Sequence, residues 1–154
     1  MKFQVSAKDK KTLCKQAPEF REVVRRIELD GFECNGDLFH ALVQSIISQQ
    51  LSIKAADTIY NRVEQLLGTI TAENLKSAAV EELRACGLSA RKIEYLRGIT
   101  DAVLSGRIDF DALARLPDEE IMKELVKLKG VGEWTAEMLL IFALGRPDVL
   151  SFKD

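Results

Sequence analysis

The sequence feature that most constrains the fold is a pair of glycines placed between two helical patterns. Apolar residues at helical spacing end at Leu128, the triplet Gly130-Val131-Gly132 follows, and a second helical pattern begins at Glu133. Glycines adopt positive φ at little cost and let another backbone or a ligand come close, so the triplet predicts a tight reversal between two helices. The second helix would begin with unpaired N–H groups at the positive end of its dipole, which suits an anion such as a phosphate. The alternative is a plain helical hairpin, because Gly-x-Gly alone is a weak signal.

The rest of the chain carries helical spacing and no strand-period run, so we expect an all-α fold. Capping and stop residues predict helices from Ser6 to Lys15, from Pro18 to Asp30-Gly31, from Asp37 to Gln49, from Ser52 to Gly68, as a short pair from Thr71 to Gly87, from Ser89 to Gly106, at Asp109 to Leu113 and from Pro117 to Leu128. The helix that follows Asp37 is apolar on more than half of its circumference, so we expect it to be central and buried.

Composition excludes several classes of protein. The three cysteines, Cys14, Cys34 and Cys86, are far apart and odd in number, which favours buried reduced thiols over a disulfide framework or a zinc site. With His40 as the single histidine, a multi-histidine metal site cannot form. Because His40 lies on an otherwise apolar helix, we expect a packed or surface residue and not a member of a histidine-based triad. The sequence has neither a signal-peptide core nor a run of roughly 18 apolar residues, so we expect a cytoplasmic protein without a membrane span.

The net charge of −2 argues against a protein that covers many phosphates with lysine and arginine. It leaves room for a protein that holds one or two phosphates with backbone amides and a local basic rim. Lys127 and Lys129 beside the glycines supply part of such a rim, whereas Glu133 and Glu137 act against it.

Two separated motifs in this chain resemble one known family. The first is Leu-Lys-Gly-Val-Gly-Glu-Trp-Thr-Ala at residues 128–136, followed by an apolar helix, Gly145 and Asp154; the second is Phe-His-Ala-Leu-Val-Gln-Ser-Ile-Ile-Ser-Gln-Gln-Leu-Ser at residues 39–52. Together they resemble the helix-hairpin-helix DNA glycosylases with a Gly/Pro-rich loop and an aspartate, most closely the 3-methyladenine branch, over Phe39 to Asp154.

The resemblance implies a helix-hairpin-helix glycosylase fold with two helical lobes around a cleft. Residues 36–145 would form a contiguous lobe with the hairpin at 128–133, and residues 1–35 and 146–154 would belong to the second lobe. Because members of the family continue for several helices past the position of Asp154, we expect the second lobe to be incomplete in this chain.

The resemblance also implies a catalytic residue. Asp154 lies 22 residues after Gly132, where the family carries its catalytic aspartate. A carboxylate beside the anomeric carbon can stabilise an oxocarbenium-like sugar or help a water to attack it. The alternatives are a solvated aspartate at this position, or a catalytic role for Asp148, which we interpret as a cap or loop residue.

Trp134 separates two types of glycosylase. Relatives that also cut the DNA backbone carry a lysine there, whose amine forms a Schiff base with the sugar, and an indole cannot do this. The resemblance therefore implies a monofunctional hydrolase with water as the nucleophile. Trp134 would instead stack on an alkylated, positively charged purine, and Met138 one turn later would share that face. A tryptophan packed in the core is the alternative.

Further residues are assigned by the resemblance alone. Gln50 matches the position from which family members insert a wedge into the duplex, with a solvated helix end at Gln49 and Gln50 as the alternative. Lys129, Gly130 and Gly132 would contact DNA. No cofactor is required, but a structural Na⁺ or K⁺ is implied at the hairpin, with the main-chain carbonyls of Val126, Leu128 and Val131 as ligands.

The resulting hypothesis is a monomeric DNA N-glycosylase of base excision repair. It would flip alkylated purines of the 3-methyladenine type out of damaged double-stranded DNA and hydrolyse their N-glycosidic bonds. The alternatives are a non-catalytic helix-hairpin-helix DNA-binding module and a bifunctional glycosylase/lyase for oxidised bases.

Overall fold

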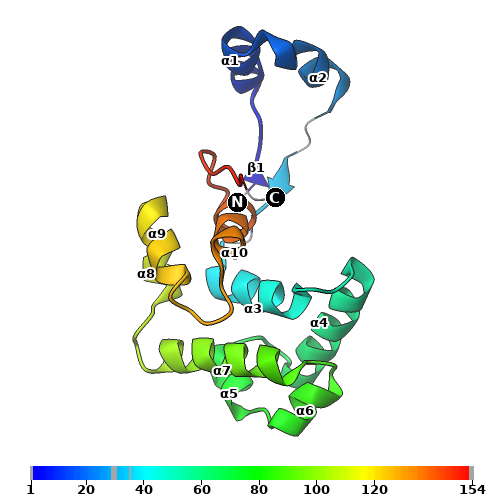
Figure 1. The fold of residues 1–154 in the computed structure, drawn as a ribbon, viewed down its shortest axis with the longest axis vertical. Helices are drawn as coiled ribbons and strands as arrows, with labels where there is room; N and C mark the ends of the chain where they lie inside the picture. The colour runs from blue at the N-terminus through cyan, green and yellow to red at the C-terminus, as the bar shows by residue number, and fades with distance from the viewer. Residues whose placement is uncertain (1, 29–30, 35, 153–154) are drawn as a thin grey trace. The chain divides into compact units, whose positions relative to one another are not determined.

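Helices dominate the structure, a computed structural model that describes residues 2–28, 31–34 and 36–152. The all-α prediction is confirmed. The chain divides into two compact units, an N-terminal unit of residues 1–35 and a main unit of residues 36–154 (Figure 1).

The N-terminal unit contains a helical pair and a short antiparallel ladder. Its elements are β1 (Lys2–Phe3), α1 (Ala7–Gln16), the 3₁₀ turn η1 (Pro18–Phe20), α2 (Arg21–Arg26) and β2 (Phe32–Glu33). Ser6 caps α1, as predicted, by accepting the N–H of Asp9 at 3.1 Å, while the Asp9 carboxylate accepts the N–H of Ser6 at 2.9 Å. Two residues per strand are too few to give a periodic pattern, and the ladder was not predicted.

The second helix of this unit ends earlier than predicted. Ile27 is already extended, with φ −102° and ψ 122°, so α2 stops at Arg26 and does not continue to Asp30-Gly31. Asp30 itself lies outside the described residues.

The main unit follows the predicted series of helices closely. Its elements are α3 (Leu38–Ser48), α4 (Ile53–Leu67), α5 (Ala72–Ser77), α6 (Val80–Ala85), α7 (Ala90–Leu104), α8 (Phe110–Leu113), α9 (Asp118–Leu125), α10 (Glu133–Met138) and the π-helical turn η2 (Leu139–Ala143). Asp37, Ser52 and Ser89 each accept a first-turn N–H and so begin α3, α4 and α7, as predicted.

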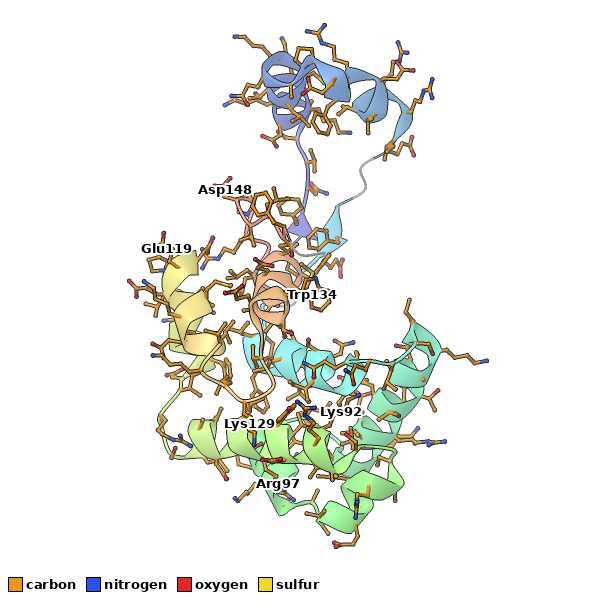
Figure 2. The ribbon with its side chains drawn as sticks, viewed as in Figure 1. Lys92, Arg97, Glu119, Lys129, Trp134 and Asp148 are labelled. Carbon is orange, nitrogen blue, oxygen red and sulfur yellow. The ribbon has the colours of Figure 1, made fainter. Side chains whose placement is uncertain are left out.

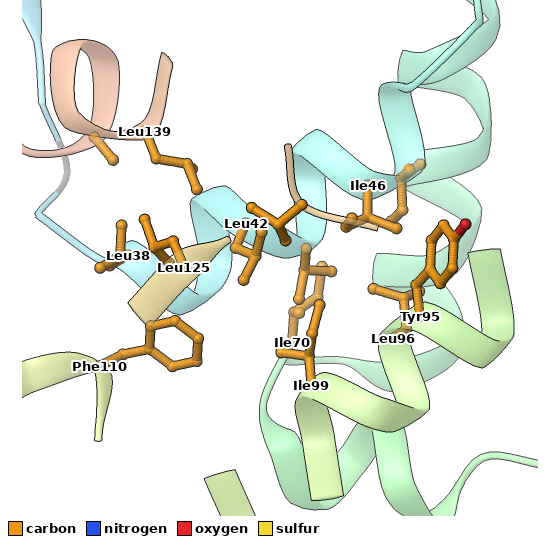
Figure 3. Packing of buried hydrophobic residues seen from close by; sticks show 14 of the residues in the cluster. Leu38, Leu42, Ile46, Ile70, Tyr95, Leu96, Ile99, Phe110, Leu125 and Leu139 are labelled. Atoms are coloured by element: carbon orange, nitrogen blue, oxygen red, sulfur yellow. The ribbon is translucent and has the colours of Figure 1, made fainter. Parts of the chain in front are cut away.

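The core of the main unit is built around α3, as its apolar pattern predicts. Leu42, Val43, Ile46 and Ile47 of α3 are completely buried, and the helix contacts α4, α7, α8 and η2. Figure 3 shows side chains of α3 meeting those of α7 and α9 in this cluster. Each buried Leu or Ile stabilises the fold by about 1.5–3 kcal/mol. The end of α3 is therefore anchored in the buried core of the unit.

Two observations concern the membrane span and the cysteines. Within the described ranges, every helix is too short or too polar to span a bilayer. Cys86 is a buried free thiol whose pKa is raised by desolvation, whereas Cys14 is a half-exposed free thiol.

Candidate functional site

A pocket of about 420 Å³ lies where the end of α3, the start of α7 and the turn between α9 and α10 meet. Its lining residues come from these three places: Gln49, Gln50, Ser89, Arg91, Lys92, Tyr95, Gly130, Gly132, Trp134 and Thr135. The fold thus brings together four residues that the sequence singled out, Gln50, Gly130, Gly132 and Trp134, from segments about eighty positions apart.

The turn between α9 and α10 is a tight reversal, as the two glycines predict. The N–H of Val131 donates to the carbonyl of Leu128 at 3.0 Å and closes it. Gly130 has φ +91°, and a Cβ there would collide with the ring of Tyr95. Gly132 has an extended backbone, begins α10 without a side-chain cap, and has open space where a Cβ would stand. Gly132 therefore leaves backbone accessible, whereas Gly130 is required by the fold because the Tyr95 ring packs against it.

The end of α3 is tied to this turn by a side chain. Gln49 terminates α3, and its Nε2 donates to the carbonyl oxygen of Gly130 at 2.9 Å. Gln50 follows with φ +58°, a left-handed backbone that no other non-glycine residue adopts in the part of the chain that the structure describes. The Gln50 side chain is exposed at the pocket.

Two basic residues in the first turn of α7 also line the pocket, and sequence reasoning missed them. Lys92 is half buried, and its Nζ donates to the carbonyl of Ile47 at 2.7 Å; burial lowers the pKa of this lysine. Arg91 donates to the Tyr95 hydroxyl and lies over the Tyr95 ring at 5.5 Å. An Arg-Lys pair just after the Ser89 cap was the available signal, but only the fold places it beside the turn.

Lys129, the predicted basic contact of the turn, is paired across to α7. Its Nζ forms an ion pair with Glu94, both side chains are exposed, and Glu94 raises the pKa of Lys129. Figure 2 shows Lys129 beside α7. Lys127 is likewise paired with Glu124 at 2.6 Å. The positive charge of each lysine is partly compensated, whereas Arg91 faces the pocket next to a neutral phenol.

The remaining predicted site residues lie as follows. Trp134 is 43% exposed in the first turn of α10 and lines the pocket, whereas Met138, one turn later, is half buried and does not line it. Asp148 is exposed and also outside the pocket lining. Asp154 lies outside the described residues. His40 bonds the Tyr60 hydroxyl through Nε2 at 2.5 Å, which agrees with a packed residue.

The carbonyls of the turn fit the implied monovalent cation. Leu128 O accepts one hydrogen bond, from Val131, and keeps its second lone pair. Val126 O and Val131 O accept none of the turn and cap hydrogen bonds that the described residues form. Gly130 O is oriented differently, since it accepts from Gln49. Hard oxygen donors of this kind suit Na⁺ or K⁺, whereas His, Cys, Asp and Glu side chains form no cluster of three within the described ranges.

Comparison with known proteins gives a consistent result. Residues 43–154 match the family described as HhH-GPD superfamily base excision DNA repair protein. The chain is 42% identical over 120 residues to DNA-3-methyladenine glycosylase 1 of Schizosaccharomyces pombe. The aligned region covers 75% of this chain and 53% of that protein. The chain thus spans about half the length of the curated relatives it matches.

Two solved structures share the fold over nearly the whole chain. A DNA-3-methyladenine glycosidase from Bacillus halodurans superposes with a TM-score of 0.84 at 40% identity, covering 100% of this chain and 72% of that one. The Schizosaccharomyces pombe 3-methyladenine DNA glycosylase in complex with abasic DNA gives a TM-score of 0.81 at 34% identity, covering 96% of this chain and 75% of that one.

Proposed function

Since the chain belongs to the HhH-GPD superfamily of base excision DNA repair proteins, we propose that it is a monofunctional DNA N-glycosylase that removes alkylated purines of the 3-methyladenine type from double-stranded DNA. The observation that carries the proposal is the pocket in which Gln50, Trp134 and the Gly130–Gly132 turn converge. The names of the relatives support the same substrate class.

The first step is the capture and opening of the duplex. Backbone amides at Gly130 and Gly132 hold a phosphate, because a helix start leaves N–H groups without intrahelical partners and open space adjoins Gly132. Gln50 enters the base stack where the damaged nucleotide leaves it, which offsets part of the unstacking cost of a few kcal/mol. Carbonyls of Val126, Leu128 and Val131 would hold a Na⁺ or K⁺, which would supply positive charge to attract the phosphate.

The second step is recognition of the flipped base. Alkylation at N3 or N7 gives a purine a positive charge, which strengthens its stacking on an aromatic face by roughly 0.5–2 kcal/mol. Trp134 offers such a face at the pocket. The same charge makes the base a better leaving group, so the pocket requires no strong general acid.

The third step is hydrolysis of the glycosidic bond. We assign to Asp154 the carboxylate that stabilises the oxocarbenium-like sugar and aligns the attacking water. Trp134 occupies the position where the lyase relatives place a Schiff-base lysine, so no strand cleavage follows. Lys92 also lines the pocket, but its amine donates to the Ile47 carbonyl of α3, so we do not assign it the role of the Schiff-base lysine.

The setting of this activity is part of the same proposal. The enzyme acts as a monomer, and residues 36–145 form its contiguous helical lobe. It works in the cytoplasm, at the nucleoid if the organism is bacterial, because its substrate is genomic DNA.

Base release from methylated duplex DNA, measured with the full natural chain, tests the proposal. We expect release of 3-methyladenine, a loss of about 10²-fold or more in Asp154→Asn, and little change in Asp148→Asn as the matched control. Binding without base release, or equal rates for wild type and Asp154→Asn, would instead indicate a non-catalytic DNA-binding module. Borohydride trapping of the wild-type protein on abasic DNA would indicate a bifunctional glycosylase/lyase.

A further inference from the structure

Gln49, which precedes the Gln50 wedge, joins the wedge to the phosphate-holding turn. We propose that Gln49 is a positioning residue whose side-chain amide sets the register between Gln50 and the Gly130–Gly132 turn, so that holding the strand and inserting the wedge become one event. This inference rests on the proposed function and adds a role that the family match does not assign to this residue.

The conformation of Gln50 is the first reason. Its φ of +58° lies in the left-handed region, where a residue with a Cβ is disfavoured relative to a helical or extended backbone. Such a conformation persists only where its surroundings hold it. Gln50 is exposed, so its own side chain does not supply the restraint, and its neighbours in the chain must.

The second reason is how the neighbours of Gln50 are held. Ile46 and Ile47 in the last turn of α3 are fully buried, and Lys92 of α7 holds the Ile47 carbonyl at 2.7 Å. The Gln49 side chain then reaches out of α3 to Gly130, which itself rests on the Tyr95 ring. The wedge is thus restrained from α7 on one side and from the turn on the other.

The third reason is the direction that Gln49 gives to a peptide group of the turn. A trans peptide is planar, so its C=O and its N–H point in opposite directions. Because the Gly130 carbonyl faces Gln49, the N–H of the same peptide, which belongs to Val131, faces away and donates to Leu128 at 3.0 Å. Gln49 therefore fixes the position of the turn relative to the wedge, and loss of the amide would uncouple the two.

Gln49→Met tests the inference, since methionine has nearly the same length and shape but no donor. Gln44→Met is the matched control, because Gln44 is exposed on the same helix and does not line the pocket. The readouts are the fluorescence of 2-aminopurine beside a methylated purine, which reports flipping, and single-turnover base release. With the full natural chain, we expect Gln49→Met to lower both by about 10- to 100-fold at a melting temperature close to that of wild type. Gln44→Met is expected to stay close to wild type.

A double-mutant cycle separates positioning from a general structural role. If Gln49 acts through Gln50, then Gln49→Met combined with Gln50→Ala flips the base no worse than Gln50→Ala alone. Additive losses would overturn the inference, as would wild-type flipping by Gln49→Met. Should Gln49→Met fail to fold, Gln49→Asn, which keeps the amide but is one methylene too short, replaces it in the cycle.

The failure of the inference and that of the proposed function give different results. If the wild-type protein neither flips nor releases a base, both are wrong. If the wild type does both and Gln49→Met matches it, the proposed function stands and only the role of Gln49 is refuted.

Discussion

The two glycines of the turn differ in what each contributes, which can be measured separately. Gly130 combines φ +91° with the Tyr95 ring at the place of a Cβ, whereas Gly132 has φ −95° and open space there. We expect Gly130→Ala to destabilise the fold by about 2–4 kcal/mol, from left-handed strain plus overpacking, and to lower Tm by roughly 5–15 °C. Gly132→Ala should melt as wild type does but bind DNA more weakly, because its methyl group occupies the space of the phosphate. Equal melting temperatures for the two variants would contradict this division.

Trp134 is the residue at which substrate choice can be tested. Its exposed indole in the pocket should stabilise a cationic purine more than a neutral one. Trp134→Leu is therefore expected to slow release of 3-methyladenine by about 2- to 30-fold more than release of hypoxanthine, as the cation–π range predicts. Competition assays with both lesions in one duplex mixture measure the ratio directly. An equal loss on both bases would mean that Trp134 packs the site without selecting charge.

At the scale of the element, one arginine holds α5 against α7. Arg97 of α7 donates through Nη1 to the carbonyls of Leu75 at 2.7 Å and Lys76 at 2.5 Å, and through Nη2 to that of Ala78. These are the carbonyls that the end of α5 leaves without helical partners. An ammonium cannot reproduce this planar fork. Arg97→Lys should therefore cost about 1.5–3 kcal/mol in urea unfolding, whereas Arg107→Lys, at an exposed arginine after α7, should cost almost nothing.

The elements that sequence reasoning predicted are those with local signals. Asp37, Ser52 and Ser89 mark helix starts by side-chain chemistry that acts within one turn, and the buried face of α3 follows from its apolar spacing. The π-helical turn η2 has no such signal. The Leu144 N–H reaches the Leu139 carbonyl, five residues back, at 3.2 Å, in a segment whose Leu139, Leu140 and Ala143 are buried. Tertiary packing decides between α and π turns there.

The pocket was predicted only in part for the same reason. Gly130 and Gly132 predict a turn because glycine adopts positive φ at little cost. Gln50 and Trp134 were assigned through the family motif. Nothing local to Arg91 or Lys92 indicates that α7 begins beside that turn, and nothing local to Gln49 indicates a bond to a residue 81 positions later. Contacts between distant segments depend on how whole helices pack. That packing is determined by many residues together, so no local motif predicts it.

At the scale of the whole molecule, charge determines how binding responds to salt. With a net charge of −2 and Lys127 and Lys129 already paired with Glu124 and Glu94, we expect backbone amides and few cations to hold the duplex. Affinity should then fall with a log–log salt slope of only about −2 to −4, which corresponds to a few phosphates.

The contribution of Arg91 to that slope can be measured separately. Arg91 lines the pocket and donates to the Tyr95 hydroxyl, and among the described residues it forms no ion pair with a carboxylate. Arg91→Gln should make the slope shallower by about 1 unit, the share of a single phosphate. Lys127→Gln, at a paired lysine, should leave the slope unchanged. Fluorescence anisotropy of a labelled duplex between 50 and about 300 mM salt measures all three proteins. A wild-type slope near −10 would reveal a basic face that these pairs do not account for, and binding would then depend on side-chain charge more than on the turn.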